Sequence, residues 1–303
     1  MKTMTYKKKY VSTTNACKLC RPLGAMLAFR GIEGAVPFLH GSQGCATYMR
    51  RYIISHFNEP IDIASSSLGE KNAVYGGGAN IKQGLVNVIN KFHPTMVGIA
   101  TTCLTETIGD DVEMFLSQFR RETEGQPLPH LIHTSTPSYS GTHMEGFHGA
   151  VRATVDALAE PEATGATLNL LPGFISPADT RYLQEIMADF NIAATILPDI
   201  SETLDAPALR KYEMIPEGGT PISAIRGMGG ARASIEFGRT IIDTLSPGQL
   251  LEERFNIPCS RLGVPMGLRE TDRFFAELEQ LTGIPTPEKH AKERGRLIDG
   301  CVD

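Results

Sequence analysis

Short apolar runs alternate with longer stretches of helical periodicity over the first 160 residues of the chain. These runs have the length of short strands, and the one at 96–100 has the continuous apolar character of a strand that is buried in a parallel sheet. They lie at 35–40, 96–100 and 130–134. Apolar residues at helical spacing occupy the stretches between them. These stretches are 22–30, the segment from Cys45 toward Pro60, 81–89, 104–121 and 146–158. This alternation of strands and helices predicts an α/β domain with a parallel sheet.

The same alternation starts again after a polar segment at 158–165, which has the composition of a linker. Two strands and an intervening helix are expected, followed by a short helix, a glycine turn and a longer helix. In order they are 168–171, 177–189, 192–197, 221–225, 227–230 and 234–245. Residues 266–299 are charged and have helical spacing. We therefore expect two Rossmann-like units with mostly parallel sheets at 1–160 and 165–260, and a C-terminal helical segment at 261–303.

The composition is that of a globular protein, with 41% hydrophobic and 21% charged residues in a chain of 303. A net charge of −5 gives no electrostatic basis for binding nucleic acid. The basic run Lys7-Lys8-Lys9 has the character of a solvated tail. No apolar stretch reaches the roughly 18 residues of a membrane span, and the N-terminus lacks the apolar core of a signal peptide. A cytoplasmic protein without membrane contact is predicted.

Three of the six cysteines lie where a predicted helix is about to begin: Cys20, Cys45 and Cys103. The helix dipole and the free N–H groups at a helix N-terminus lower the pKa of a thiol. Thiolates of this kind hold iron–sulfur clusters. Three similar settings predict a cluster site, and a cluster with four cysteine ligands would need its fourth ligand from elsewhere. Gly24, Gly41 and Gly44 are expected to let backbone approach a bulky cluster closely.

Other interpretations of these residues are less well supported. Cys17 and Cys20 form a C-x-x-C, but a zinc site would need a second such pair, and a redox pair would need a strand directly before it. The turn at 227–232 lacks the last glycine of a dinucleotide-binding motif. His40, His56 and His93 are expected to be structural or to lie behind the ligands. No constellation for acid–base or nucleophilic catalysis stands out, which suits electron transfer or a scaffold.

Five segments together resemble the beta-type side of the nitrogenase component 1 superfamily. They are CRPLGA from Cys20, HGSQGC ending at Cys45, SHFNEP at 55–60, YGGGAN at 75–80 and TTCLTETIGDD at 101–111. The resemblance covers nearly all of the chain and is highly specific. It implies that Cys45 is a cluster ligand, and that Cys20 and Cys103 match P-cluster ligands of catalytic beta subunits. Ser138 matches the serine that can ligate the oxidised P-cluster.

Within this superfamily, the sequence is most similar to NifN, the iron–molybdenum cofactor assembly protein. The segments LPGFISPADTRYL at 171–183 and MGGARASIEFG at 228–238 favour this assignment. It implies a scaffold subunit that pairs with a NifE-type partner in a heterotetramer, holds a [4Fe–4S] cluster between the subunits and receives electrons from the nitrogenase iron protein. The alternative is a catalytic beta subunit that carries half of a P-cluster beside a nitrogenase alpha subunit. Family members have three α/β domains, and the third is expected to be absent from this sequence.

Overall fold

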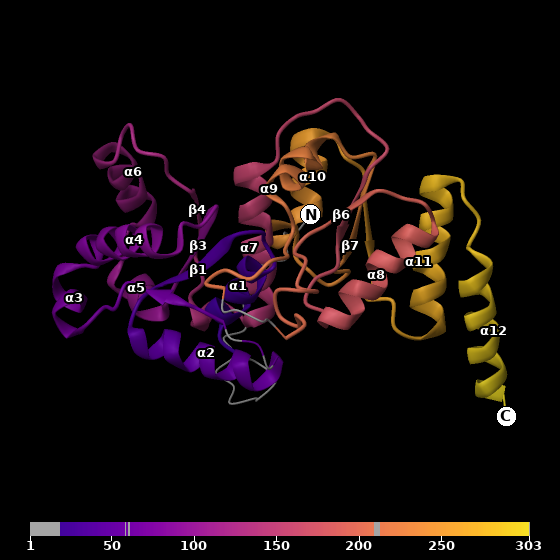
Figure 1. The fold of residues 1–303 in the computed structure, drawn as a ribbon, viewed down its shortest axis with the longest axis horizontal. Helices are drawn as coiled ribbons and strands as arrows, with labels where there is room; N and C mark the ends of the chain where they lie inside the picture. The colour runs from indigo at the N-terminus through magenta and orange to yellow at the C-terminus, as the bar shows by residue number, and fades with distance from the viewer. Residues whose placement is uncertain (1–18, 58, 60, 209–212, 303) are drawn as a thin grey trace, which may run out of the picture.

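Two four-stranded parallel sheets form the framework of the computed structural model, which describes residues 19–57, 59, 61–208 and 213–302 (Figure 1). The first sheet has the order β2-β1-β3-β4 and the second the order β6-β5-β7-β8. All strand pairs are parallel. The strands are β1 (Ala35–His40), β2 (Ala64–Ser65), β3 (Met96–Thr101), β4 (His130–Thr134), β5 (Leu168–Leu171), β6 (Ala194–Ile196), β7 (Ala233–Phe237) and β8 (Cys259–Leu262). The predicted α/β class with two parallel-sheet units is confirmed.

The order in which strands are added to the first sheet reverses between β1 and β3. The chain passes from β1 to β2 on one side, and then crosses back so that β3 and β4 extend the sheet on the other side. His40 and Thr101 are register partners at the carboxyl ends of β1 and β3. The connections that leave these two strands diverge, and open α/β sheets bind their ligands at the carboxyl ends of strands where such a divergence occurs. This edge is therefore where functional residues are expected.

Helices cover both faces of the first sheet (Figure 1). The side chains of α4 (Gly78–Phe92) and α6 (Val112–Glu122) pack with β1, β3 and β4 on one face. On the other face, α1 (Arg21–Arg30), α2 (Gln43–Phe57) and α7 (His143–Leu158) close the core. Two short helices, α3 (Glu70–Tyr75) and α5 (Cys103–Ile108), lie in the connections. The 3-10 turn η1 (Ser138–Ser140) follows β4.

Helix α7 contacts both halves of the described chain. It packs against α1 and β4 of the first unit, and against α9 (Ile222–Arg226) and α10 (Pro247–Phe255) of the second. One hydrophobic cluster extends from Leu39 and Ile132 of the first sheet to Leu171 of the second. The two sheets therefore share a core, and the division of the chain at 160 and 260 stays a prediction.

The second sheet carries α8 (Pro177–Asp189) and α11 (Gly267–Thr282) against one core, and α12 (Glu288–Val302) follows α11. The predicted helical segment after residue 265 is confirmed by α11 and α12. Within the described residues, no helix combines the length and the apolar character that crossing a membrane requires. The cytoplasmic location stays a prediction.

The predicted helix at 234–245 is wrong, because residues 233–237 form the central strand β7. Ser234 and Glu236 made this segment look amphipathic, yet both are buried with partners. Asn169 donates to the Ser234 hydroxyl at 3.2 Å, and the Ser246 hydroxyl donates to Glu236 at 2.6 Å. The helix of this region is instead α10 at 247–255, and β8 after it was not predicted.

Candidate functional site

Two of the three cysteines lie at the carboxyl edge of the first sheet. Cys45 is in the first turn of α2, after β1, and Cys103 is the first residue of α5, after β3. Because β1 and β3 are parallel neighbours, the segments that follow them begin at the same edge. Cys20 is the N-cap of α1, with Pro22 in the first turn. The prediction that each cysteine lies at a helix start is confirmed.

Contacts with the segment after β4 place Cys20 near the same edge. The His143 N–H donates to the Leu19 carbonyl at 2.9 Å, directly before the cysteine. The Arg21 guanidinium, directly after it, donates to the Ser140 hydroxyl at 2.7 Å. Cys20 is therefore held between two hydrogen bonds that reach across to η1 and the start of α7.

Burial raises the pKa of the Cys20 thiol, and the neighbouring Cys45 and Cys103 thiols raise it further. The pKa of Cys45 is likewise raised, first by burial and then by Cys103. The expectation of lowered thiol pKa values is wrong for these two cysteines, because removal from water outweighs the donors at the helix start. The mutual effects on pKa also mean that the three thiols lie within electrostatic reach of one another.

Ser138 lies in η1, and hydrogen bonds connect its segment to two cysteine-bearing segments. The Thr136 N–H donates to the Thr101 hydroxyl at 2.8 Å, and the Thr136 hydroxyl donates to the Thr101 carbonyl at 2.6 Å. Thr101 precedes Cys103 by two positions, and Ser140 accepts from Arg21 beside Cys20. Ser138 is thus on the same edge as the cysteines, and its role as a ligand stays a prediction.

Two of the glycines that were expected to make room for a cluster make room for protein instead. A Cβ at Gly24 would overlap the His143 carbonyl of α7, and a Cβ at Gly41 would overlap the Thr102 side chain. Gly44 differs, because a Cβ there would meet only the Ser42 hydroxyl, at 3.5 Å. Gly24 and Gly41 therefore position the cysteine segments by close packing, and only Gly44 leaves open space next to Cys45.

The cysteine trio suits a cluster of several irons better than a single ion. Cys20, Cys45 and Cys103 are all free thiols. In the part of the chain that the structure describes, no three His, Cys, Asp or Glu side chains are close enough to share one metal ion. In an iron–sulfur cluster, each thiolate binds a different iron, so the ligands stand further apart. The chemistry of the three thiol donors thus fits an iron–sulfur cluster.

The remaining candidates from the sequence do not join the site. Cys259 lies on β8 of the other sheet, where burial first and Glu236 second raise its pKa to about 12. His93 is the C-cap of α4, in the left-handed conformation at φ 48°, which is a structural position. The turn at 227–230 is a 3-10 helix in which a Cβ at Gly229 would overlap the Glu160 carbonyl, so a phosphate has no room there. Cys17 and Lys7–Lys9 lie outside the described residues.

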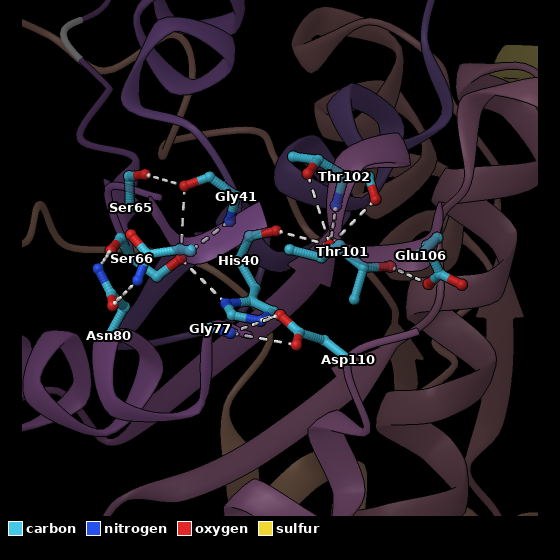
Figure 2. Close-up of polar contacts among 12 residues, drawn as sticks. His40, Gly41, Ser65, Ser66, Gly77, Asn80, Thr101, Thr102, Glu106 and Asp110 are labelled. Carbon is cyan, nitrogen blue, oxygen red and sulfur yellow. Dashed lines mark hydrogen bonds and ion pairs between the residues drawn. The ribbon is translucent and has the colours of Figure 1, made fainter. Parts of the chain in front are cut away.

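His40 forms a buried polar network at the carboxyl end of β1, which Figure 2 shows. Its Nδ1 lies 2.9 Å from the Ser66 hydroxyl, and its Nε2 lies 3.1 Å from the Asp110 carboxylate. Burial lowers the pKa of His40, and Asp110 opposes that effect. The sequence predicts His40 as a structural residue behind the ligands, and does not single out Asp110. The pair of acidic residues after the glycine at 109 was the available signal.

Comparison with known proteins agrees with the fold. The family model "Nitrogenase component 1 type Oxidoreductase" matches residues 20–303. The nitrogenase molybdenum-iron protein beta chain of Clostridium pasteurianum is 37% identical over 95% of this chain and 63% of its own length. The iron-molybdenum cofactor biosynthesis protein NifN of Nostoc sp. is 32% identical over 100% of this chain and 68% of its own.

A solved structure described as nitrogenase Cp1 at pH 6.5 has a chain that superimposes with a TM-score of 0.91. That chain is 36% identical, and the match covers 97% of this chain and 64% of the other. This chain therefore spans less than two thirds of the length of several relatives that it matches. The family match over residues 20–303 and the identities to beta chains lead to one conclusion: the chain belongs to the nitrogenase component 1 type oxidoreductase family, on its beta-chain side.

Proposed function

We propose that this chain is the beta-type subunit of a nitrogenase component 1 complex, and that Cys20, Cys45 and Cys103 bind an iron–sulfur cluster shared with an alpha-type partner subunit. The observation that carries the proposal is the convergence of three free thiols from three separate segments. The names of the most similar relatives support it, since they are beta chains of a molybdenum-iron protein. Membership of their family makes a metal–sulfur cluster the expected cofactor.

The ligand count supports a shared cluster. Three thiols leave at least one coordination position of a four-iron cluster without a cysteine from this chain. Cys103 is exposed, and Cys45 is only partly buried. A second subunit that covers this edge would complete the ligand set and remove the cluster from water. The strand order reverses between β1 and β3 at the same edge, which is where α/β proteins generally bind ligands.

The residues of this chain would prepare and tune the site. The bound cluster would supply the capacity to take up and release single electrons. Each ligating cysteine must lose its Sγ proton, because the thiolate is the metal ligand. Burial holds Cys20 and Cys45 in the protonated form, so loading of the site is favoured as pH rises. The same burial limits contact of the sulfurs with water once the metal is bound.

The complete set of Cys20, Cys45, Cys103 and Ser138 favours the electron-transferring beta chain over the assembly scaffold. By resemblance, all four positions belong to one half of a P-cluster. The identity of 37% to the Clostridium beta chain, against 32% to the Nostoc NifN, points the same way. In this role, the cluster would pass electrons from the nitrogenase iron protein to a cofactor in the alpha subunit.

A NifN-type scaffold is the second candidate. The observation in its favour is the match to the Nostoc NifN over 100% of this chain. The segments LPGFISPADTRYL and MGGARASIEFG support it by resemblance. In this role, a NifE-type partner would complete a [4Fe–4S] site at which the precursor of the molybdenum cofactor matures.

Iron content separates the two roles. The chain is co-expressed with an alpha-type partner or a NifE-type partner, and iron per heterodimer is measured with the EPR spectrum. About eight irons that are EPR-silent after reduction by dithionite are expected for the P-cluster role, and about four irons with a signal in the reduced state for the scaffold. A folded complex without iron in every preparation would contradict both.

A further inference from the structure

His40 holds both ends of α5, the short helix that begins with Cys103. At the start of the helix, its carbonyl accepts the Thr102 N–H at 3.1 Å and the Thr105 hydroxyl at 3.1 Å. At the end of the helix, its imidazole bonds Asp110, which follows the C-cap Gly109. One residue of β1 thus contacts both termini of the helix, and Figure 2 shows these bonds around His40.

Two hydrogen bonds hold the imidazole of His40 between Asp110 and Ser66. The Asp110 carboxylate can only accept, so Nε2 of His40 carries the proton and donates to it. In the neutral ring, Nδ1 then accepts from the Ser66 hydroxyl, which itself accepts the Gly41 N–H at 2.9 Å. The Gly77 N–H also donates to Asp110, at 3.1 Å to each oxygen. This arrangement fixes the tautomer and the ring orientation of His40.

The same strand end leads into the segment of Cys45. Five positions separate His40 from Cys45, and the Cys45 N–H is held by the Ser42 carbonyl at 3.2 Å. His40 therefore fixes α5 directly and lies at the base of the Cys45 segment. It is fully buried, and the Asp110 side chain is 5% exposed. Burying such a pair gains little stability over an apolar pair of the same size, so stability alone does not account for it.

We propose that the His40–Asp110 pair is a positioning device that sets the Cys103 sulfur relative to the Cys45 sulfur for cluster binding. This inference rests on the proposed function and adds the residues that control the spacing of two ligands. Neither residue is a ligand. Asp110 acts through α5, since it fixes the end of a helix whose first residue is Cys103.

The test compares Asp110→Asn with Glu113→Gln. Asparagine keeps the shape of Asp110, but it loses the negative charge that faces His40, and an NH2 donor replaces one of the two oxygens that face the Gly77 N–H. Glu113 forms a similar pair with His133, at 2.9 Å in the same unit, but its side chain is 68% exposed and belongs to α6. Glu113→Gln therefore controls for the loss of a carboxylate beside a histidine.

The first measurement needs no metal. The full chain is purified with its partner, iron is removed by chelation, and dibromobimane is added to bridge neighbouring thiols. Mass spectrometry of the peptides then follows the Cys45–Cys103 product. Asp110→Asn should form it about tenfold more slowly than the wild type, because small displacements of reacting groups cost large factors in rate. Glu113→Gln should form it at the wild-type rate.

The second measurement uses the iron-loaded complex. Asp110→Asn should shift the EPR line shape and the midpoint potential of the bound cluster, whereas Glu113→Gln should not. A folded Asp110→Asn variant with wild-type cross-linking and an unchanged spectrum would overturn the inference. If Asp110→Asn does not fold, Ser66→Ala takes its place, since it removes the donor to Nδ1, and a wild-type rate there would equally overturn it.

These results separate the two proposals. A wild-type complex without iron refutes the proposed cluster, while the cross-linking rates still decide whether His40 and Asp110 set the spacing of the thiols. Iron bound normally in the wild type, with no effect of Asp110→Asn, refutes the positioning role and leaves the cluster proposal in place.

Discussion

Gly146 of α7 packs so closely on Arg21 of α1 that a Cβ at position 146 would overlap the Arg21 carbonyl. The approach is reciprocal, since Gly24 of α1 lies against the His143 carbonyl of α7 in the same way. Cys20 is the N-cap of α1, so the packing of these two helices determines where its thiol lies.

Gly146→Ala is therefore expected to destabilise the protein by about 1–3 kcal/mol, the usual cost of overpacking a close contact. Urea unfolding measures this change. Gly295→Ala is the matched control, because Gly295 lies within α12 and a Cβ there would meet nothing within 4 Å. That substitution should raise stability by up to about 1 kcal/mol through helix propensity. Equal effects of the two substitutions would contradict the close packing of α1 and α7.

His148 of α7 makes stability depend on pH. Burial lowers its pKa from 6.5 to about 4, although Glu145 nearby opposes the shift. Between these values, the unfolded chain binds a proton that the folded protein does not, so stability falls as pH decreases from about 6.5 toward about 4. The loss is on the order of 3 kcal/mol. No stability is lost through His148 at pH values above about 6.5, the pKa of this group in the unfolded chain.

His148→Gln should flatten the difference in stability between pH 7 and pH 4.5 relative to the wild type. The measurement is the free energy of unfolding in urea at a series of pH values across this range. His40, His130 and His143 also have lowered pKa values and remain in both proteins, so only the difference between the two curves reports His148. If the free energies of unfolding of the two proteins changed with pH in parallel, the pKa of His148 would be the same in the folded and the unfolded chain, which would contradict the prediction.

Ser138→Ala separates the two proposed roles. If the site holds half of a P-cluster, the reduced cluster should keep its iron and its spectrum, because the three cysteines are unchanged. The oxidised cluster should show an altered EPR spectrum, since the serine ligand is lost. If the site is a scaffold's [4Fe–4S] cluster, neither oxidation state should change. Loss of iron in the reduced state would contradict both expectations.

Much of the fold follows from the apolar pattern. The run at 96–100 is continuously apolar, so the burial of β3 on both faces could be predicted. The strand at 130–134 carries two histidines that are only partly buried, so there the pattern predicted a strand and not its burial. The break in the helix at Gly109 could not be predicted from the spacing of apolar residues. The expected helix at 104–121 is two helices, because Gly109 adopts φ 77° and ends α5. That break is what places Asp110 beside His40.

Strand β7 could not be predicted for a different reason. Its polar residues Ser234 and Glu236 are satisfied by partners from distant positions, including Asn169 and Ser246. Such partners are invisible in a local pattern, so a buried strand had the appearance of an amphipathic helix.

The cysteine trio was predictable as a set because each member precedes or begins a helix, but its electrostatics were not. The helix-start argument gave the wrong direction for the pKa of Cys20 and Cys45, since the sequence does not reveal how deeply a thiol is buried. The network of His40, Ser66, Gly77 and Asp110 also depends on tertiary contacts between four separate segments.

The iron content of two cysteine variants decides whether the trio of Cys20, Cys45 and Cys103 binds the cluster. Cys45→Ala removes a thiol of the trio, and Cys259→Ala removes a partly buried thiol of the second sheet. Each variant is purified with its partner, and iron per folded heterodimer is measured. The account predicts that Cys45→Ala loses most of its iron while Cys259→Ala keeps the wild-type content. Full iron in a folded Cys45→Ala complex would contradict it.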